Sequence, residues 1–314
     1  MLEARHFPAA TKDSMVSAPP ADARKKVTVP EVRSRKVGGP PLAMVTAYDY
    51  TMARLADEAG VDMVLVGDSL GMVVQGHANT LPVTVDDICY HGRAVARGVA
   101  HAHVVGDLPF MSYQISPLRA LESAGRLVKD GAFESVKMEG GKEIAAHIAR
   151  VVKAGIPVMG HVGLEPQRVH SLGGFKVQGR GKDDATRIVV DARAVEAAGA
   201  YALVLEAIPP DLAEEITRAL SIPTIGIGAG AHCDGQVLVC TDLLGMTRGS
   251  APPRFVKRYA ETGETIVEAM RRYVGDVQSG AFPGPEHAFK PNEPIGADAP
   301  IHRPATRARA SGLQ

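Results

Sequence analysis

The chain has 314 residues, of which 45% are hydrophobic, so it is long enough to bury a large core. Its 35 Lys and Arg residues balance 35 Asp and Glu residues, which argues against a nucleic-acid partner or a membrane-surface partner. No apolar run has the length of a membrane span, no signal segment stands out, and the cysteines (Cys89, Cys233 and Cys240) form no C-x-x-C pair, so we expect a cytoplasmic protein.

The two ends of the chain differ in composition from its middle. Residues 1–25 and 290–314 are rich in Ala, Pro and charged residues, so we predict a disordered N-terminal arm and a flexible C-terminal tail. Residues 26–289 are predicted to form a single folded domain between these two extensions.

Short apolar runs recur along this middle segment in chain order, and they are continuous rather than alternating, which is typical of strands buried on both faces. Their ranges are 43–47, 63–66, 104–105, 135–139, 157–163, 202–206, 223–230 and 237–240. Helix-like stretches separate most of them, and several end in Ala-Gly, the signature of a C-cap glycine before a return strand. Their ranges are 50–60, 84–99, 117–131, 141–155, 184–199 and 210–220.

This alternation predicts parallel β-α-β units. Eight such strands favour a closed (β/α)₈ barrel, also called a TIM barrel, and an open doubly wound sheet is the alternative. Thr84 is predicted to be the N-cap of the helix over 84–99, because two acidic residues follow in its first turn.

Charged side chains stand where successive predicted strands end. Asp68 and Ser69 follow the second run, Asp107 follows the third, and Glu139 ends the fourth. In a parallel barrel the carboxyl ends of all the strands meet at one mouth, where active sites of this fold lie. Because clustered carboxylates repel one another unless a cation lies among them, these acids indicate a site for a hard cation such as Mg²⁺. The alternative is that they cap helices or lie on surface loops.

Other polar residues occupy neighbouring strand ends. Lys137 shares a strand face with Glu139, so it either pairs with an acid or binds a substrate anion. Glu206 ends the sixth run at a depth that partly desolvates a carboxylate, which suits a general base; capping the next turn is the alternative. His161 either donates a hydrogen bond to a substrate oxygen or is structural. The glycine-rich stretch 173–184 is either a lid or a passive connection.

Several longer motifs, taken together, resemble the ketopantoate hydroxymethyltransferase family. The motifs are VTAYDY, VGDSLGMVVQGHANTLPVTVDD, GDLPFMSY, VKMEGG, GHVGLEPQ, GGFKVQGRG, VLEAIP and IGIGAGAHCDGQ. The resemblance extends from about residue 25 to about residue 289 and includes nearly every predicted strand end. It is therefore far more specific than any single motif.

The resemblance implies a cytosolic, Mg²⁺-dependent (β/α)₈ barrel enzyme that assembles into a homo-oligomer, typically a decamer. It implies transfer of a hydroxymethyl group from 5,10-methylenetetrahydrofolate to 3-methyl-2-oxobutanoate, giving ketopantoate on the route to pantothenate. By position, the metal-binding acids of the family fall on Asp68, Asp107 and Glu139. Its keto-acid contacts fall on Asp68, Ser69, Asp107 and Lys137. Its general base falls on Glu206.

The residues and the resemblance together predict that Mg²⁺ polarises the keto acid and that Glu206 removes the C3 proton to give an enolate. Two other functions are considered. A lyase or mutase of the isocitrate lyase and phosphoenolpyruvate mutase type also uses Mg²⁺ and an enolate, but it does not need folate. A non-catalytic oligomeric scaffold is expected to lack Asp68, Asp107 or Glu206, and all three are present.

Overall fold

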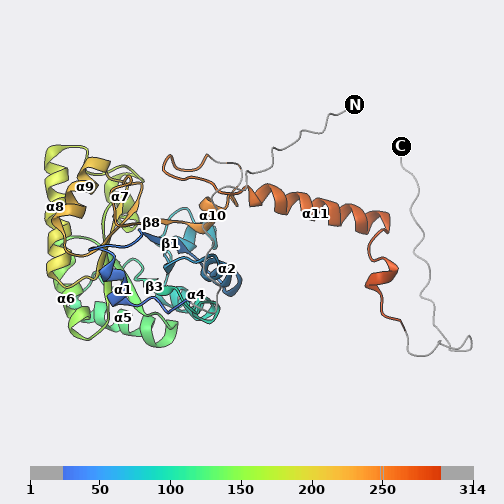
Figure 1. Cartoon of the computed structure of the whole chain (residues 1–314), viewed down its shortest axis with the longest axis horizontal. Helices are drawn as coiled ribbons and strands as arrows, with labels where there is room; N and C mark the ends of the chain where they lie inside the picture. Colours follow the sequence, from blue (N-terminus) through green and yellow to red (C-terminus); the bar gives the residue numbers. More distant parts are fainter. Residues whose placement is uncertain (1–23, 248, 250, 291–314) are drawn as a thin grey trace, which may run out of the picture. The chain divides into compact units, whose positions relative to one another are not determined.

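The computed structural model describes residues 24–247, 249 and 251–290. Eight parallel strands follow one another around a closed barrel in chain order, and β8 pairs with β1 (Figure 1). The strands are β1 (Leu42–Thr46), β2 (Met63–Val66), β3 (His103–Asp107), β4 (Ser135–Glu139), β5 (Val158–Gly163), β6 (Ala202–Glu206), β7 (Thr224–Ile227) and β8 (Gly235–Leu238). The predicted barrel is confirmed, and the open-sheet alternative is wrong because the first and last strands are hydrogen-bonded to each other.

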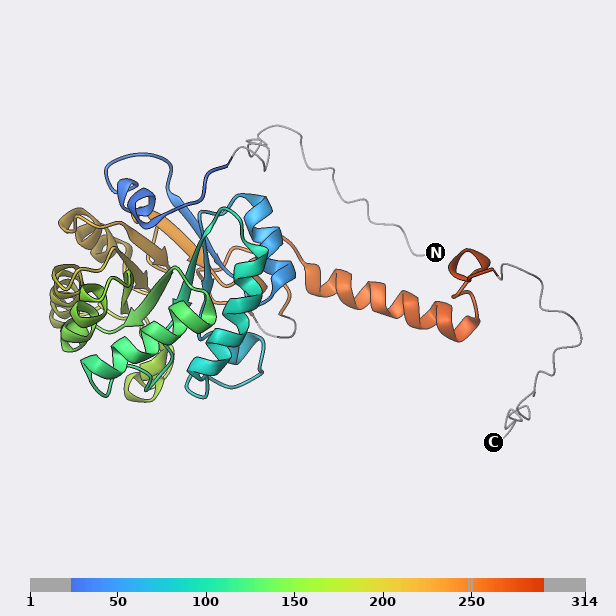
Figure 2. The same cartoon turned by 90° about the horizontal axis from the view of Figure 1, so that it is seen from below.

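Helices surround the strands on the outside of the barrel (Figures 1 and 2). The longer ones are α2 (Tyr50–Ala59), α4 (Val85–Gly98), α5 (Pro117–Gly131), α6 (Ala145–Lys153), α8 (Lys182–Ala197) and α9 (Pro210–Ala219). The shorter ones are α1 (Val29–Ser34), α3 (Leu70–Val73), α7 (Val169–Leu172), α10 (Cys240–Leu243) and the 3₁₀ turns η2 (Lys142–Ile144) and η3 (Pro166–Arg168). The connection from β7 to β8, residues 228–234, contains no helix.

Local chemistry fixes the ends of these helices. Thr84 is the N-cap of α4, as predicted: its Oγ1 accepts a hydrogen bond from the Asp87 amide at 3.2 Å, and the Asp87 carboxylate accepts one from the Thr84 amide at 2.9 Å. This reciprocal pair is a capping box. Gly60, the predicted C-cap of α2, adopts a left-handed conformation with φ of 94°, which glycine reaches without steric cost.

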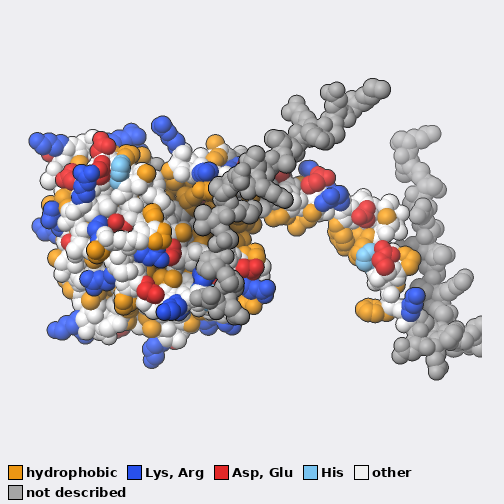
Figure 3. Space-filling model, viewed as in Figure 1, with side chains coloured by type: hydrophobic (Ala, Val, Ile, Leu, Met, Phe, Trp, Pro, Cys, Tyr) orange, Lys and Arg blue, Asp and Glu red, His pale blue; other side chains and the backbone are white. Residues whose placement is uncertain are grey.

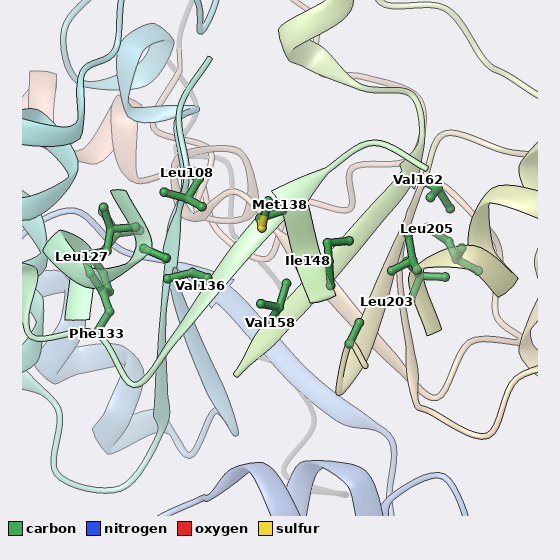
Figure 4. Close-up of a cluster of buried hydrophobic side chains, with 14 of the residues drawn as sticks. Leu108, Leu127, Phe133, Val136, Met138, Ile148, Val158, Val162, Leu203 and Leu205 are labelled. Atoms are coloured by element: carbon green, nitrogen blue, oxygen red, sulfur yellow. The ribbon is translucent and has the colours of Figure 1, made fainter. Parts of the chain in front are cut away.

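Two buried clusters divide the core by strand face. The larger cluster lies between the strands and the surrounding helices and includes Val136 and Met138 of β4 together with Leu127 of α5 (Figure 4). The other contains alternate residues of the same strands, such as Met159 and Val204. Because side chains alternate across a strand, this second set faces the barrel interior.

The surface of the barrel carries both signs of charge. On the face seen in Figure 3, Lys and Arg side chains are interspersed with Asp and Glu side chains, which agrees with a formal net charge of zero for the whole sequence. No helix among the described residues has the length and apolar character needed to cross a membrane.

The described residues from Gly263 to Lys290 belong to a second compact unit. Its described part contains α11, which spans Thr262–Ser279, and the 3₁₀ turn η4 (Pro285–His287). Within this unit the Phe282 ring contacts the rings of Tyr273 and His287, with centroid separations of 5.6 and 5.0 Å. The domain limits predicted from sequence stay a prediction, and the predicted arm (1–25) and tail (290–314) lie almost entirely outside the described residues.

Candidate active site

The predicted site residues continue the inner face of their strands. Asp107 follows the inward-facing Val105 by two residues, and His161 and Glu206 follow Met159 and Val204 in the same way. This spacing directs their side chains to the inside of the barrel at its carboxyl end. The strand register brings the same residues level, since Asp107 pairs with Lys137 and Glu139 with His161.

Asp68, Asp107 and Lys137 lie in contact at this mouth. Asp107 accepts a hydrogen bond from the Asp68 amide at 3.2 Å, and its other oxygen lies 3.0 Å from Lys137 Nζ. All three residues are at most 5% exposed. Lys137 therefore forms an ion pair with an acid, Asp107, which is one of its two predicted roles. The ion pair leaves the other role, binding of a substrate anion, as a prediction.

His161 connects two further carboxylates. Its Nδ1 lies 3.3 Å from Glu139 Oε2, and its Nε2 lies 3.2 Å from Glu206 Oε2. The alignment at both pairs falls short of a hydrogen bond, so the attraction is chiefly electrostatic. His161 and Glu139 are buried, whereas the Glu206 side chain is 17% exposed. Glu206 thus stands at the outer end of the row.

The pKa values follow from burial and from these contacts. Burial and the carboxylates of Asp107 and Glu139 raise the pKa of Asp68 well above its ordinary value. Burial favours the neutral amine of Lys137, but the surrounding carboxylates outweigh it and raise its pKa. Burial and the Lys137 charge favour a neutral His161 ring, yet Glu139 and Glu206 outweigh them and raise its pKa to about 9. Asp68 therefore holds a proton more tightly than an ordinary aspartate, so ionisation of every acid in the cluster requires further positive charge, which a bound cation would supply.

Ser69 lies beside a residue that the sequence analysis did not select. The hydroxyl of Tyr48, two residues after β1, is 2.8 Å from Ser69 Oγ, and Tyr48 is buried. The motif VTAYDY contains this tyrosine, but nothing in its spacing marked the side chain as part of the site. Tyr48 fixes the Ser69 hydroxyl next to Asp68.

Gln167, in η3 after β5, was also missed. Its side-chain amide donates to Asp68 Oδ2 at 3.0 Å, and its backbone amide donates to Glu139 Oε1 at 2.6 Å. Gln167 is the last residue of the motif GHVGLEPQ, which is one of the motifs that carry the family resemblance. No strand or helix pattern in the sequence marks the glutamine itself as a site residue. Two of the predicted acids are therefore held by one residue outside the strands.

The donor set suits a divalent cation, although the acids do not already enclose one. Among the described residues, no group of three His, Cys, Asp or Glu side chains is arranged as a finished metal cage. Asp107 Oδ1 and Glu139 Oε2 are buried and have no well-aligned hydrogen bond among the described residues. Each faces a positive group of the protein instead, Lys137 Nζ at 3.0 Å and His161 Nδ1 at 3.3 Å. Carboxylate oxygens of this kind are ligands for Mg²⁺, which also keeps several waters. Asp68, Asp107 and Glu139 are thus the residues that would hold it.

The glycine-rich connection after α7 is joined to the end of β6. The Gln178 amide donates to the Ala207 carbonyl, the residue after Glu206, at 2.9 Å. Phe175 and Val177 of the same connection are exposed. The middle of the predicted lid is thus bound next to the end of β6, and its movement stays a prediction.

Comparison with known proteins identifies the family. The ketopantoate hydroxymethyltransferase family model matches residues 26–285. The chain belongs to the ketopantoate hydroxymethyltransferase family. A 3-methyl-2-oxobutanoate hydroxymethyltransferase of Anaeromyxobacter sp. (strain Fw109-5) is 57% identical over 85% of this chain and 88% of its own length. One of Syntrophotalea carbinolica is 54% identical over 85% of this chain and 99% of its own length. The predicted enzyme class is confirmed by these relatives, and the scaffold alternative is not supported.

Solved structures with a similar fold come from enzymes of another kind. A phosphoenolpyruvate phosphomutase from Streptomyces platensis subsp. rosaceus matches with a TM-score of 0.54 and 16% identity, over 80% of this chain and 88% of its own. A 2,3-dimethylmalate lyase matches with a TM-score of 0.54 and 17% identity, over 82% of this chain and 87% of its own. At such identities the likeness supports the barrel and carries no argument for lyase or mutase activity.

Proposed function

We propose that this family member forms ketopantoate by transferring a hydroxymethyl group from 5,10-methylenetetrahydrofolate to 3-methyl-2-oxobutanoate with the help of Mg²⁺. The observation that carries the proposal is the continuous row from Asp68 to Glu206, in which cation ligands and a partly exposed carboxylate are linked through Lys137 and His161. The names of the relatives support the product, and the row supports the chemistry.

The keto acid presents a carboxylate and a keto oxygen, which are both ligands for a hard cation. Bound by Asp68, Asp107 and Glu139, Mg²⁺ would act as a Lewis acid that draws electron density from the keto group and acidifies the C3 hydrogen. Ser69, held by Tyr48, is placed to hydrogen-bond the substrate carboxylate. Lys137 supplies a positive charge beside the oxygen on which negative charge develops.

Glu206 is the proposed proton acceptor. Its carboxylate takes the C3 proton, the C3–H electron pair becomes the C2–C3 double bond, and the negative charge moves to the keto oxygen. Water breaks both C–N bonds of the folate methylene group, its two hydrogens end on the two nitrogens, and tetrahydrofolate is released. The enolate carbon forms the new C–C bond to the freed one-carbon unit, whose oxygen then takes the proton held by Glu206. One water is consumed, and its oxygen becomes the hydroxyl of the product. His161, within 3.2 Å of Glu206, holds the base in place.

An assay of ketopantoate formation tests this proposal. Purified protein is supplied with 3-methyl-2-oxobutanoate in the four combinations of presence and absence of methylenetetrahydrofolate and Mg²⁺. Product is expected only when both are present. Turnover of the keto acid without folate would contradict the proposal and favour the lyase or mutase reaction.

We also propose a cytoplasmic homo-oligomer, a decamer as the family resemblance implies. The proposal includes no nucleic-acid or membrane partner, which the balanced charge of the sequence supports. Sedimentation velocity of the purified chain tests the assembly, and a monomer at micromolar concentration would contradict it.

A further inference from the structure

The side chain of Gln167 is buried, and both ends of its amide group form hydrogen bonds. It lies in η3 and is 3% exposed. A glutamine amide has two donor hydrogens and one acceptor oxygen, so its orientation is decided by what surrounds each end. Here both ends meet partners of the opposite kind.

The amide nitrogen meets two acceptors. Nε2 donates to Asp68 Oδ2 at 3.0 Å and to the Leu108 carbonyl at 2.9 Å. The oxygen meets two donors, because Oε1 accepts from Gln114 Nε2 at 2.9 Å and lies 3.0 Å from the Tyr113 hydroxyl. The Tyr113 hydroxyl also lies 2.7 Å from the Glu139 carbonyl, so its one hydrogen is shared between two acceptors. If the amide were reversed, its oxygen would face the acceptors Asp68 and the Leu108 carbonyl, and its nitrogen would face the donor Gln114 Nε2. The hydrogen bonds therefore fix the observed orientation.

The backbone of the same residue reaches a second acid. The Gln167 amide donates to Glu139 Oε1 at 2.6 Å, while Glu139 Oε2 faces His161 Nδ1 at 3.3 Å without a well-aligned hydrogen bond. Each of the two carboxylates thus has one oxygen bound to Gln167. Because the glutamine side chain is neutral, it stabilises the carboxylates without occupying the site as a competing cation.

We propose that Gln167 is a positioning residue that holds Asp68 and Glu139 so that each turns its other oxygen toward a divalent cation. This inference rests on the proposed function, since it takes the acid cluster to be the cation site. Hydrogen bonds to ligating carboxylates orient them, and loss of such a partner typically lowers metal affinity by about tenfold to a hundredfold.

Gln167→Met tests the inference, because methionine has nearly the same length and removes all four side-chain hydrogen bonds. The backbone amide remains, so the change acts on Asp68 and leaves the Glu139 contact in place. Gln114→Met is the matched control: it deletes one hydrogen bond to Gln167 and touches neither carboxylate. Mn²⁺ binding is measured by calorimetry in the absence of substrates, with the melting temperature of each protein followed in parallel.

We expect the Kd for Mn²⁺ to rise at least tenfold in Gln167→Met and to stay within about threefold of wild type in Gln114→Met. A Gln167→Met protein that melts earlier but binds Mn²⁺ like wild type would overturn the inference, since a merely structural role predicts that result. Should Gln167→Met fail to fold, Gln167→Asn, whose amide is one methylene shorter, replaces it under the same criterion. If wild type itself does not bind Mn²⁺, the proposed cation site fails first, so the two failures are distinguishable.

Discussion

Lys137 carries a positive charge among carboxylates where little water reaches. Its Nζ lies 3.0 Å from Asp107 and 3.3 Å from His161, and the residue is 5% exposed. Burial of a charge is costly unless a partner compensates it, and here the carboxylates do so. Without bound metal, Lys137 and the His161 ring, whose pKa is raised to about 9, are therefore the positive charges that hold the acid cluster together.

Lys137→Met removes that charge and keeps the length of the side chain. In EDTA the acids then repel one another, and we expect the free energy of unfolding to fall, by up to about 3–5 kcal/mol for a broken buried pair. Mg²⁺ should restore part of this loss, because it supplies the missing positive charge. The KM for the keto acid should rise and turnover should fall.

Thermal melts with EDTA and with Mg²⁺ check the first part, and steady-state kinetics check the second. Lys142→Met, an exposed lysine five residues further along the chain, is the control and should change neither. Wild-type kinetics in Lys137→Met would show that the ion pair with Asp107 is purely structural.

Site residues at or just after a strand end could be predicted from sequence, and those placed only by distant contacts could not. Asp107, Glu139 and Glu206 end apolar runs, so the barrel alone places them at one mouth. Tyr48 and Gln167 owe their positions to contacts with residues distant in sequence, and no periodicity reports such contacts. The structure brings the predicted residues together, and their individual roles stay predictions.

At the scale of elements, the Phe133 ring joins α4, β3 and α5. A Cβ added at Gly92, Gly106 or Gly131 would lie 2.3, 2.6 or 2.6 Å from an atom of this ring, closer than carbon atoms approach. Glycine at these positions gives the ring its space, and the helices pack closely against the strand as a result. The β3 strand that ends at Asp107 is thus positioned in part by Phe133, which lies beside Leu127 in Figure 4.

Gly106→Ala should therefore destabilise the fold by about 1–3 kcal/mol, the usual cost of overpacking a core. Adding Phe133→Leu should recover part of that loss, because a smaller side chain leaves room for the methyl group. Gly125→Ala in α5 is the matched control, since its added Cβ would meet no atom within 4 Å. Urea unfolding of wild type, Gly106→Ala, Phe133→Leu, the double variant and Gly125→Ala measures these differences. Simple additivity of Gly106→Ala and Phe133→Leu would show that the ring is not the obstacle.

The sequence also predicted most element boundaries closely, and the differences have local causes. The strand predicted at 104–105 is longer in the structure, where it spans His103–Asp107. The prediction was too short because His103, Gly106 and Asp107 are not apolar and therefore did not count toward the apolar run. The run at 223–230 shortens to Thr224–Ile227, since the glycines that follow turn the chain: Gly228 has a φ of 65°. The helix predicted over 141–155 begins as the 3₁₀ turn η2 before α6.

At the scale of the whole molecule, a second polar network closes the opposite end of the barrel. His103 Nε2 lies 2.8 Å from Ser135 Oγ, which lies 2.9 Å from the Tyr201 hydroxyl. His103 Nδ1 is 3.7 Å from Glu134, whose carboxylate pairs with Lys26 at 2.8 Å. Burial lowers the pKa of His103 to about 4, and Lys26 adds to this against the attraction of Glu134. The network therefore requires a neutral histidine.

This shift makes stability depend on pH with a definite sign. The unfolded chain takes up a proton at His103 below about pH 6.5, whereas the folded chain does so only near pH 4. The contribution of His103 to the free energy of unfolding should thus be greatest above pH 6.5. It should fall by about 3 kcal/mol as the pH drops toward 4. His103→Gln should flatten the fall, and the exposed His77→Gln should not. Melting temperatures between pH 7.5 and 4 measure it, and equal slopes in all three proteins would contradict the assignment.

The barrel mouth as a whole is proposed to perform one proton transfer from C3 of the keto acid to Glu206, and that step is the central claim. Glu206→Gln keeps the shape of the side chain but cannot accept the proton, which should lower the rate by about a hundredfold to ten-thousandfold. The measurement is exchange of the C3 hydrogen of 3-methyl-2-oxobutanoate with D₂O, followed by NMR in the presence of Mg²⁺, with binding of the keto acid measured separately. The account predicts exchange by wild type and none by Glu206→Gln, which still binds the keto acid. Exchange by Glu206→Gln at the wild-type rate would contradict it.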